Sequence, residues 1–144
     1  MTIVRPTHQR IFAVFDRTHG RLSRQIGKAL AKLGIKPAQA MALVYLGYHD
    51  GCQPSELAHG VGSNNAAITG LVERMEAAGL VKRRSMSSDG RAKSIHLCTQ
   101  GLVKREQVME IFKTYDAKLA SGFTDSEMQT IYKFLAKAAD LEAV

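Results

Sequence analysis

The chain has 144 residues, 45% of them hydrophobic and 23% charged, which is typical of one globular domain and too apolar for a disordered chain. No stretch approaches the roughly 20 apolar residues that span a bilayer, and no apolar run follows the N-terminus. We therefore expect no membrane segment and no signal peptide, and a cytoplasmic protein whose formal net charge of +7 favours a polyanionic partner.

Most of the positive charge lies in the first third of the chain, where residues 1–50 carry 8 basic and 2 acidic side chains. Apolar residues recur at three- and four-residue steps from Thr7 to Leu33, which predicts one long helix that ends at Gly34. The basic side chains occupy other positions of this helix: Arg10, Arg17, Arg21, Arg24, Lys28 and Lys32.

Residues 37–49, 54–62 and 64–79 are expected to form three shorter helices. The first two begin at a proline, a residue favoured in the first turn of a helix. Asn64 is suited to cap the third, because its side chain can accept a hydrogen bond from a free amide of the first turn. The inward positions of this third helix follow at helical spacing: Ile68, Leu71, Val72 and Met75.

The sequence period then changes from helical to alternating. Residues 80–86 and 93–98 are typical of two short strands, and Asp89-Gly90 between them is a turn dipeptide, so the pair forms a hairpin. Thr99 is suited to cap a fifth, long helix. Thr124 and Glu127 form a capping box that opens a final helix, whose inward positions are Met128, Ile131, Leu135 and Ala138.

This order of elements predicts a mainly α (α+β) fold: two short helices joined by a tight turn and followed by a basic hairpin form a winged helix-turn-helix with a two-stranded wing. The expected parts are an N-terminal dimerisation helix (residues 1–35), a DNA-binding domain (36–99) and C-terminal dimerisation helices (100–144), all within one integrated domain. Dimerisation is expected because the outer helices carry wide apolar stripes, and such stripes must be covered.

The segment SELAHGVGSNNAAITGLVERMEAAGLVKRR, followed by DGRAKSIHLCTQG, resembles the MarR family of bacterial transcriptional regulators. The run LVERMEAAGLVKRR with DGR at this interval is the more specific part, and the helix order and chain length agree. The resemblance implies a symmetric homodimer that binds a pseudo-palindromic operator in double-stranded DNA. It also implies release of that DNA by a small ligand or by thiol oxidation.

The fourth helix is expected to enter the major groove of DNA, because a helix fits that groove and its N-terminal amides favour a phosphate. Asn65 and Thr69 are candidates for hydrogen bonds to base edges. Gly70 departs from the longer polar or basic residue that many family members carry at this position, which predicts thin base readout. The full set expected at DNA on this helix is Asn64, Asn65, Ala66, Ala67, Thr69, Gly70 and Arg74.

The hairpin is expected to supply a second DNA contact. Arg91 lies at its tip, where a guanidinium can enter a narrow minor groove with enhanced negative potential. Asp89, through its match in the family, is implied to hold that guanidinium. Arg83, Arg84 and Lys93 are expected at phosphates.

No motif in the sequence indicates catalysis. The histidines form no HExxH pattern, the glycines form no phosphate-binding loop, and no Ser-His-Asp set can be picked out. We therefore expect a protein that is not an enzyme and that has no metal and no cofactor. Cys52 and Cys98 form no CxxC pair and are interpreted as reduced thiols, with a redox sensor as the alternative.

A small-molecule effector is the remaining partner that the resemblance implies. Relatives bind ligands where the first, second and fifth helices meet the wing domain, and packing is the alternative role for the aromatic candidates. The function expected is a ligand-responsive repressor; a sequence-tolerant architectural DNA-binding protein and a winged-helix protein-interaction module stay open. The candidate ligand-lining residues are Phe12, Phe15, Tyr45, Tyr48 and Tyr115.

Overall fold

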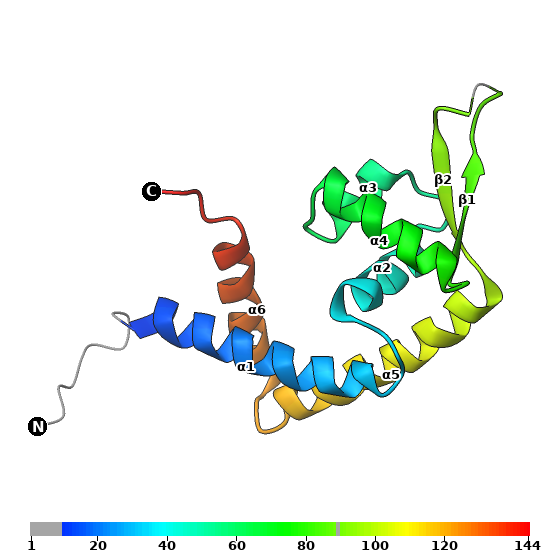
Figure 1. Cartoon of the computed structure of the whole chain (residues 1–144). Helices are drawn as coiled ribbons and strands as arrows, with labels where there is room; N and C mark the ends of the chain where they lie inside the picture. Colours follow the sequence, from blue (N-terminus) through cyan, green and yellow to red (C-terminus); the bar gives the residue numbers. More distant parts are fainter. Residues whose placement is uncertain (1–9, 89) are drawn as a thin grey trace, which may run out of the picture. The chain divides into compact units, whose positions relative to one another are not determined.

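A computed structural model describes residues 10–88 and 90–144, and within these ranges it holds six helices and one two-stranded sheet (Figure 1). The contacts within the chain divide it into two units, Met1–Ile111 and Phe112–Val144. The elements in chain order are α1 (Ile11–Ala31), α2 (Pro37–Tyr48), α3 (Pro54–Gly60), α4 (Asn65–Ala77), β1 (Val81–Ser85), β2 (Lys93–Leu97), α5 (Thr99–Ala120) and α6 (Asp125–Ala139).

The predicted order of helices and strands is therefore confirmed, as are two predicted caps. The Asn64 side chain accepts a hydrogen bond from the Ala67 amide at 2.9 Å. Thr124 and Glu127 bond each other reciprocally, at 3.0 and 3.2 Å. The predicted cap of the fifth helix is wrong by one residue: the Cys98 carbonyl accepts the bond from the Leu102 amide at 3.0 Å, so Thr99 already lies inside α5.

The core of the first unit lies between α2, α3, α4 and the hairpin. The inward stripe predicted for α4 is confirmed, since all four of its residues are buried. The other elements add apolar side chains around this stripe, and most of them are almost fully buried. The core residues from α2, α3 and the hairpin are Ala40, Ala42, Leu43, Leu46, Leu57, Ala58, Val81 and Ile95.

The hairpin is antiparallel, with a register that runs from Val81 opposite Leu97 to Ser85 opposite Lys93. Its base is tied to the turn after α2, because Ile95 exchanges backbone hydrogen bonds with that turn: the Gly51 amide donates to the Ile95 carbonyl at 2.8 Å, and the Ile95 amide donates to the Cys52 carbonyl at 2.9 Å. This attachment fixes where the hairpin leaves the core.

The outer helices carry apolar side chains that one copy of the chain does not cover. On α1, Phe12 is 82% exposed, while Ile11 and Phe15 are less than half exposed. In the second unit, α6 has no fully buried residue, and Leu135 of its predicted stripe is 40% exposed. None of the helices described is long and apolar enough to cross a membrane.

Alanine substitutions at two glycines should change the free energy of unfolding in opposite directions. A Cβ at Gly101, in the buried first turn of α5, would meet the Leu80 carbonyl oxygen, a backbone atom that cannot move aside. Gly101→Ala should lower the free energy of unfolding by about 1–3 kcal/mol through overpacking. A Cβ at Gly20 would meet only the end of the Arg24 side chain, at 3.5 Å. Gly20→Ala should therefore raise the free energy of unfolding by about 0.5–1 kcal/mol.

Urea unfolding of the two variants beside wild type measures both effects. A Gly101→Ala protein as stable as wild type would contradict the close approach of α5 to Leu80.

Candidate nucleic-acid interface

The outward face of α4 is fixed by the burial of its inward face. Because Ile68, Leu71, Val72 and Met75 point into the core, the residues on the opposite side of the helix point to solvent. Asn64, Asn65, Ala66, Ala67, Thr69 and Arg74 are exposed, and Gly70 is half-buried.

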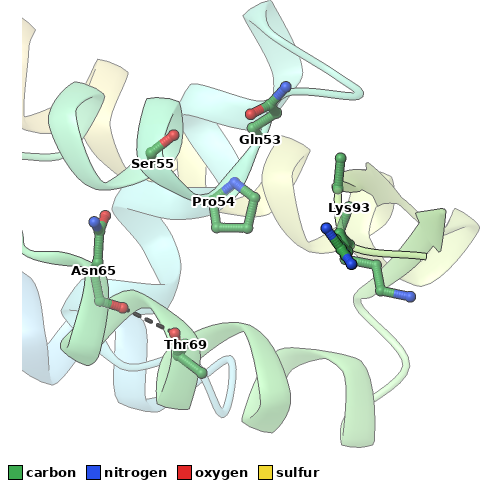
Figure 2. Close-up of a pocket in the computed structure, with 8 residues that line it drawn as sticks. Gln53, Pro54, Ser55, Asn65, Thr69 and Lys93 are labelled. Carbon is green, nitrogen blue, oxygen red and sulfur yellow. Dashed lines mark hydrogen bonds between the residues drawn. The ribbon is translucent and has the colours of Figure 1, made fainter. Parts of the chain in front are cut away.

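An open hollow runs between the exposed face of α4, the start of α3 and the loop end of the hairpin, where β2 begins. Figure 2 shows Asn65 and Thr69 on α4 across from Pro54 and Ser55, with Lys93 at the far end. Three elements that are separate in sequence thus contribute to one surface, which we call the α4–wing surface. It is lined by Gln53, Pro54, Ser55, Asn65, Thr69, Arg91, Ala92 and Lys93.

Four residues that the sequence predicts at DNA lie together on this surface: Asn65, Thr69, Arg91 and Lys93. The sequence does not predict the four others: Gln53, Pro54, Ser55 and Ala92. A signal for the first three was present, since the first helix of a helix-turn-helix crosses the DNA backbone beside the recognition helix.

The polar side chains of α4 differ in what they can still bind. The side-chain oxygen of Asn64 is used in capping. The Thr69 hydroxyl donates to the Asn65 carbonyl at 2.9 Å, so it presents an acceptor oxygen and a methyl group rather than a donor. The side-chain amide of Asn65 makes no hydrogen bond to another described residue. Its N–H donors and its carbonyl acceptor are therefore available to an external partner.

Gly70 makes room for the side chain of Arg74. A Cβ at Gly70 would lie 3.1 Å from an Arg74 guanidinium nitrogen, so the guanidinium folds back along α4 over the glycine. The absence of a side chain at position 70 thus sets where a cation one turn later lies.

Arg83 is held by Glu76 rather than directed to solvent. Its guanidinium donates to Glu76 Oε1 from Nη2 at 2.8 Å and from Nε at 3.1 Å, and its amide donates to Glu76 Oε2 at 2.9 Å. These bonds join the last turns of α4 to β1 and neutralise the Arg83 charge. The predicted phosphate contact of Arg83 stays a prediction, and it is the one that this geometry supports least.

The remaining hairpin cations lie on different faces. Opposite residues of an antiparallel pair share a face, so Lys93 lies on the face of Ser85, whose Oγ accepts a bond from Lys93 Nζ at 3.1 Å. Arg84 lies on the other face, opposite Ser94. Arg91 is exposed in the hairpin loop, two residues before the start of β2. Asp89, predicted to hold Arg91, lies outside the described residues.

A Ser-His-Asp set that the sequence analysis did not pick out is present beside β2. His96 Nε2 lies 2.8 Å from Ser94 Oγ, and His96 Nδ1 lies 3.5 Å from Asp50 Oδ2. Asp50 also accepts the Leu97 amide at 2.8 Å. Ser94 is buried, with 8% of its surface exposed. The set ties the turn after α2 to the hairpin and has the geometry of a structural network.

The candidate ligand residues are distributed over both units. Tyr45 stacks on His49 with ring centroids 4.4 Å apart, and the Arg105 guanidinium lies 5.0 Å from the centre of the Tyr48 ring. Phe12 and Phe15 lie on α1, and Tyr115 belongs to the second unit. The ligand site stays a prediction.

The two cysteines differ in burial. Cys52 is buried, and burial, reinforced by the nearby Glu56 carboxylate, raises the pKa of its thiol. A raised pKa disfavours the thiolate, which is the reactive form. Cys98 is half-buried, and both thiols are free. No group of three His, Cys, Asp or Glu residues in the described ranges lies close enough to share a metal ion.

The fold and the α4–wing surface define a winged helix-turn-helix protein. Residues 33–92 match the family model of the MarR family. The chain is 28% identical over 119 residues to the HTH-type transcriptional repressor MdtR of Bacillus subtilis (strain 168), a match that covers 83% of this chain and 77% of the relative. These matches support a regulator of the MarR family with a winged helix-turn-helix fold.

Solved structures share the fold. The MepR–DNA complex of S. aureus superposes with a TM-score of 0.81 at 22% identity, over 88% of this chain and 93% of that chain. CouR from Rhodococcus jostii RHA1, bound to p-coumaroyl-CoA, superposes with a TM-score of 0.79 at 22% identity, over 98% of this chain and 99% of that chain.

The Glu76–Arg83 contact predicts a pH dependence of stability. Hydrogen bonds from the Arg83 side chain and backbone lower the pKa of Glu76. Such a carboxylate stabilises the folded state above its unfolded pKa of about 4.3 and loses this contribution as pH falls through the folded value. Wild type should therefore be more stable than Glu76→Gln at pH 7, by a margin that shrinks below about pH 4.

Urea unfolding across this pH range measures the margin. Glu142→Gln, which removes an exposed carboxylate near the C-terminus, serves as the control and should track wild type. A margin that does not change with pH would contradict a charged pair at this position.

Proposed function

We propose that this protein is a homodimeric, sequence-specific DNA-binding repressor that acts on operator DNA in the cytoplasm. Each subunit places α4 in a major groove and Arg91 in the adjoining minor groove. The observation that carries the proposal is the α4–wing surface, where the exposed polar face of α4 and the cations at the loop end of the hairpin line one hollow.

Base readout in this proposal rests mainly on Asn65. Its amide has a donor and an acceptor side by side, the pattern that pairs with the N6 and N7 edge of adenine in the major groove. Thr69 contributes an acceptor oxygen and its methyl group, and Ala66 and Ala67 are small enough to contact a thymine methyl. Asn64 holds the first turn of α4 in the orientation that this readout requires.

The wing supplies the electrostatic part of binding. Arg91 inserts into a narrow minor groove, whose negative potential attracts a guanidinium, and Asp89 orients it. Lys93 and Arg84, on opposite faces of the hairpin, contact phosphates on either side of that groove. Arg74, folded over Gly70, contacts the backbone of the major groove.

Dimerisation in this proposal uses the outer helices of residues 1–35 and 100–144. The apolar side chains of α1 and α6 are exposed in a single copy, and a two-fold related copy would cover both. Two-fold symmetry then sets two half-sites one helical turn apart, at roughly 34 Å between recognition helices.

Regulation by a small molecule is the least specified part of the proposal. CouR was solved with p-coumaroyl-CoA bound, which makes a ligand a reasonable effector for a protein of the same fold. A ligand shifts only an equilibrium between states that it binds unequally, so the effector must change the separation of the two α4 helices. Phe12, Phe15, Tyr45, Tyr48 and Tyr115 stay the candidate contacts.

A sequence-tolerant mode of DNA binding is the second candidate, favoured by the small residues Ala66, Ala67 and Gly70 on the exposed side of α4. Selection of bound fragments from genomic DNA tests the first proposal against it. A sequence-specific repressor should enrich one pseudo-palindromic sequence, and this sequence should compete for the protein ~10³-fold better than unrelated DNA. Enrichment without a shared sequence would overturn specific recognition.

Arg91→Ala should weaken binding to the selected operator by about 1–3 kcal/mol, because the minor-groove contact is lost. Fluorescence anisotropy at one defined salt concentration measures the affinity. Lys118→Ala removes an exposed cation from α5 and is the matched control, which should bind as wild type does. Equal affinity of Arg91→Ala and wild type would remove Arg91 from the interface.

Leu135→Arg should dissociate the dimer, because it places a charge among the apolar side chains that the partner covers. Sedimentation equilibrium should give twice the 15.8 kDa chain mass for wild type and a single chain for the variant. Gln129→Arg adds the same charge at an exposed polar position of α6 and should leave the dimer intact. A wild-type protein that sediments as one chain would refute the dimer itself.

A further inference from the structure

A row of cations runs along α1 on the side opposite its apolar stripe. Arg17, Arg21, Arg24 and Lys28 follow each other at steps of three or four residues, and Lys32 continues the row at the C-terminal end of the helix. At 3.6 residues per turn, these five positions fall within an arc of roughly 80°. We call this row the α1 cation stripe.

The charges of the stripe are not neutralised within the subunit. All five side chains are exposed. None of the five forms an ion pair with any residue in the ranges 10–88 and 90–144. The single acidic residue of α1, Asp16, lies roughly 120° around the helix from the centre of the stripe. A solvated row of like charges repels itself, and a polyanion relieves this repulsion.

The stripe is separate from the α4–wing surface. α1 packs on α2, whereas α4 and the hairpin pack on each other and on α2. In Figure 1, α1 lies on the far side of α2 from the hairpin. A duplex on the α4–wing surface therefore leaves the stripe open to a second partner.

The chemistry of the stripe fits a phosphodiester backbone. The fifteen steps from Arg17 to Lys32 span about 22 Å, and that length of duplex carries about 13 negative charges, enough to neutralise all five cations. Three of the five are arginines, whose planar fork matches phosphate oxygens. A membrane-surface helix must bury its apolar face in lipid, but this face of α1 is directed into the protein at Ile26 and Leu30.

We propose that the α1 cation stripe is a second, sequence-independent binding surface for the phosphodiester backbone of nucleic acid. With the α4–wing surface occupied, the stripe lets one protein hold a second segment of duplex. This role accounts for the excess of positive charge in residues 1–50, most of which lies outside the α4–wing surface.

The test compares full-length proteins that all carry Arg84→Gln, Arg91→Gln and Lys93→Gln, so that the three wing cations of the proposed operator contact are absent throughout. To this background we add either Arg17→Gln, Arg21→Gln and Arg24→Gln, or Lys113→Gln, Lys118→Gln and Lys137→Gln. Both sets remove three exposed helical cations, so the two proteins have the same net charge. The probe is a random-sequence duplex about three helical turns long, titrated by anisotropy at several salt concentrations.

The background protein should bind the random duplex. The stripe substitutions should reduce the log–log salt slope by about 2.7, since three phosphate contacts are lost, and the control substitutions should leave it unchanged. Arg17→Lys, Arg21→Lys and Arg24→Lys in the same background should restore the slope. Far-UV circular dichroism verifies that α1 remains helical.

Equal slopes for the stripe and control proteins would overturn the proposal, as would failure of the background protein to bind the random duplex. If the stripe substitutions abolished binding to phosphatidylserine vesicles and left the salt slope for DNA unchanged, the stripe would be assigned to lipid. That result would also overturn the proposal. These outcomes do not depend on operator recognition, because every protein compared carries the same three wing substitutions and the probe is a random-sequence duplex.

Discussion

The burial of one face of α4 is the constraint on which the rest of the molecule depends. Ile68, Leu71, Val72 and Met75 are inserted between α2, α3 and the hairpin, so the helix cannot rotate about its own axis. Asn65 and Thr69 are thereby held outward, toward the start of α3 and the loop end of the hairpin. A recognition helix needs this rigidity, because base readout depends on side chains that stay in register with base edges.

The hairpin is fixed to the same core by polar contacts on both of its faces. Glu76 holds Arg83 on one face, and Asp50 holds His96 and the Leu97 amide on the other. The helix and the wing therefore move as one body. In this account, DNA binding changes when the distance between the α4–wing bodies of the two subunits changes, while each body keeps its own structure.

Much of the fold follows from the sequence, because each local signal agrees with the tertiary packing. The apolar period of residues 68–75, the cap at Asn64 and the capping box at Thr124 each act within a few residues, so the pattern alone predicts them. What the sequence could not predict depends on long-range pairing. Glu76 lies seven residues from Arg83, and Asp50 lies 46 from His96; these partners meet only once α2, α4 and the hairpin have packed.

The candidate site was predictable to a similar extent. Asn65, Thr69, Arg91 and Lys93 follow from the position of a recognition helix and a wing. Gln53, Pro54 and Ser55 reach the same hollow only because α3 packs against α4, a crossing that no local pattern specifies. The role of Gly70 was also hidden, since its effect is on where the Arg74 guanidinium lies.

The distribution of charge separates two tasks. At the end of α4 a carboxylate pairs with Arg83 and stiffens the hairpin, whereas the cations of the α4–wing surface and of α1 face solvent. The ion pair inside the molecule stabilises its shape, and the exposed cations attract the polyanion.

The most direct test of the central account is methylation interference on the selected operator. Dimethyl sulfate marks guanine N7 in the major groove and adenine N3 in the minor groove. The account predicts two patches of guanine interference centred about one helical turn apart, each flanked by adenine interference where Arg91 enters. Interference confined to one groove, or a single patch without its symmetric partner, would contradict the pairing of helix and wing on adjacent grooves.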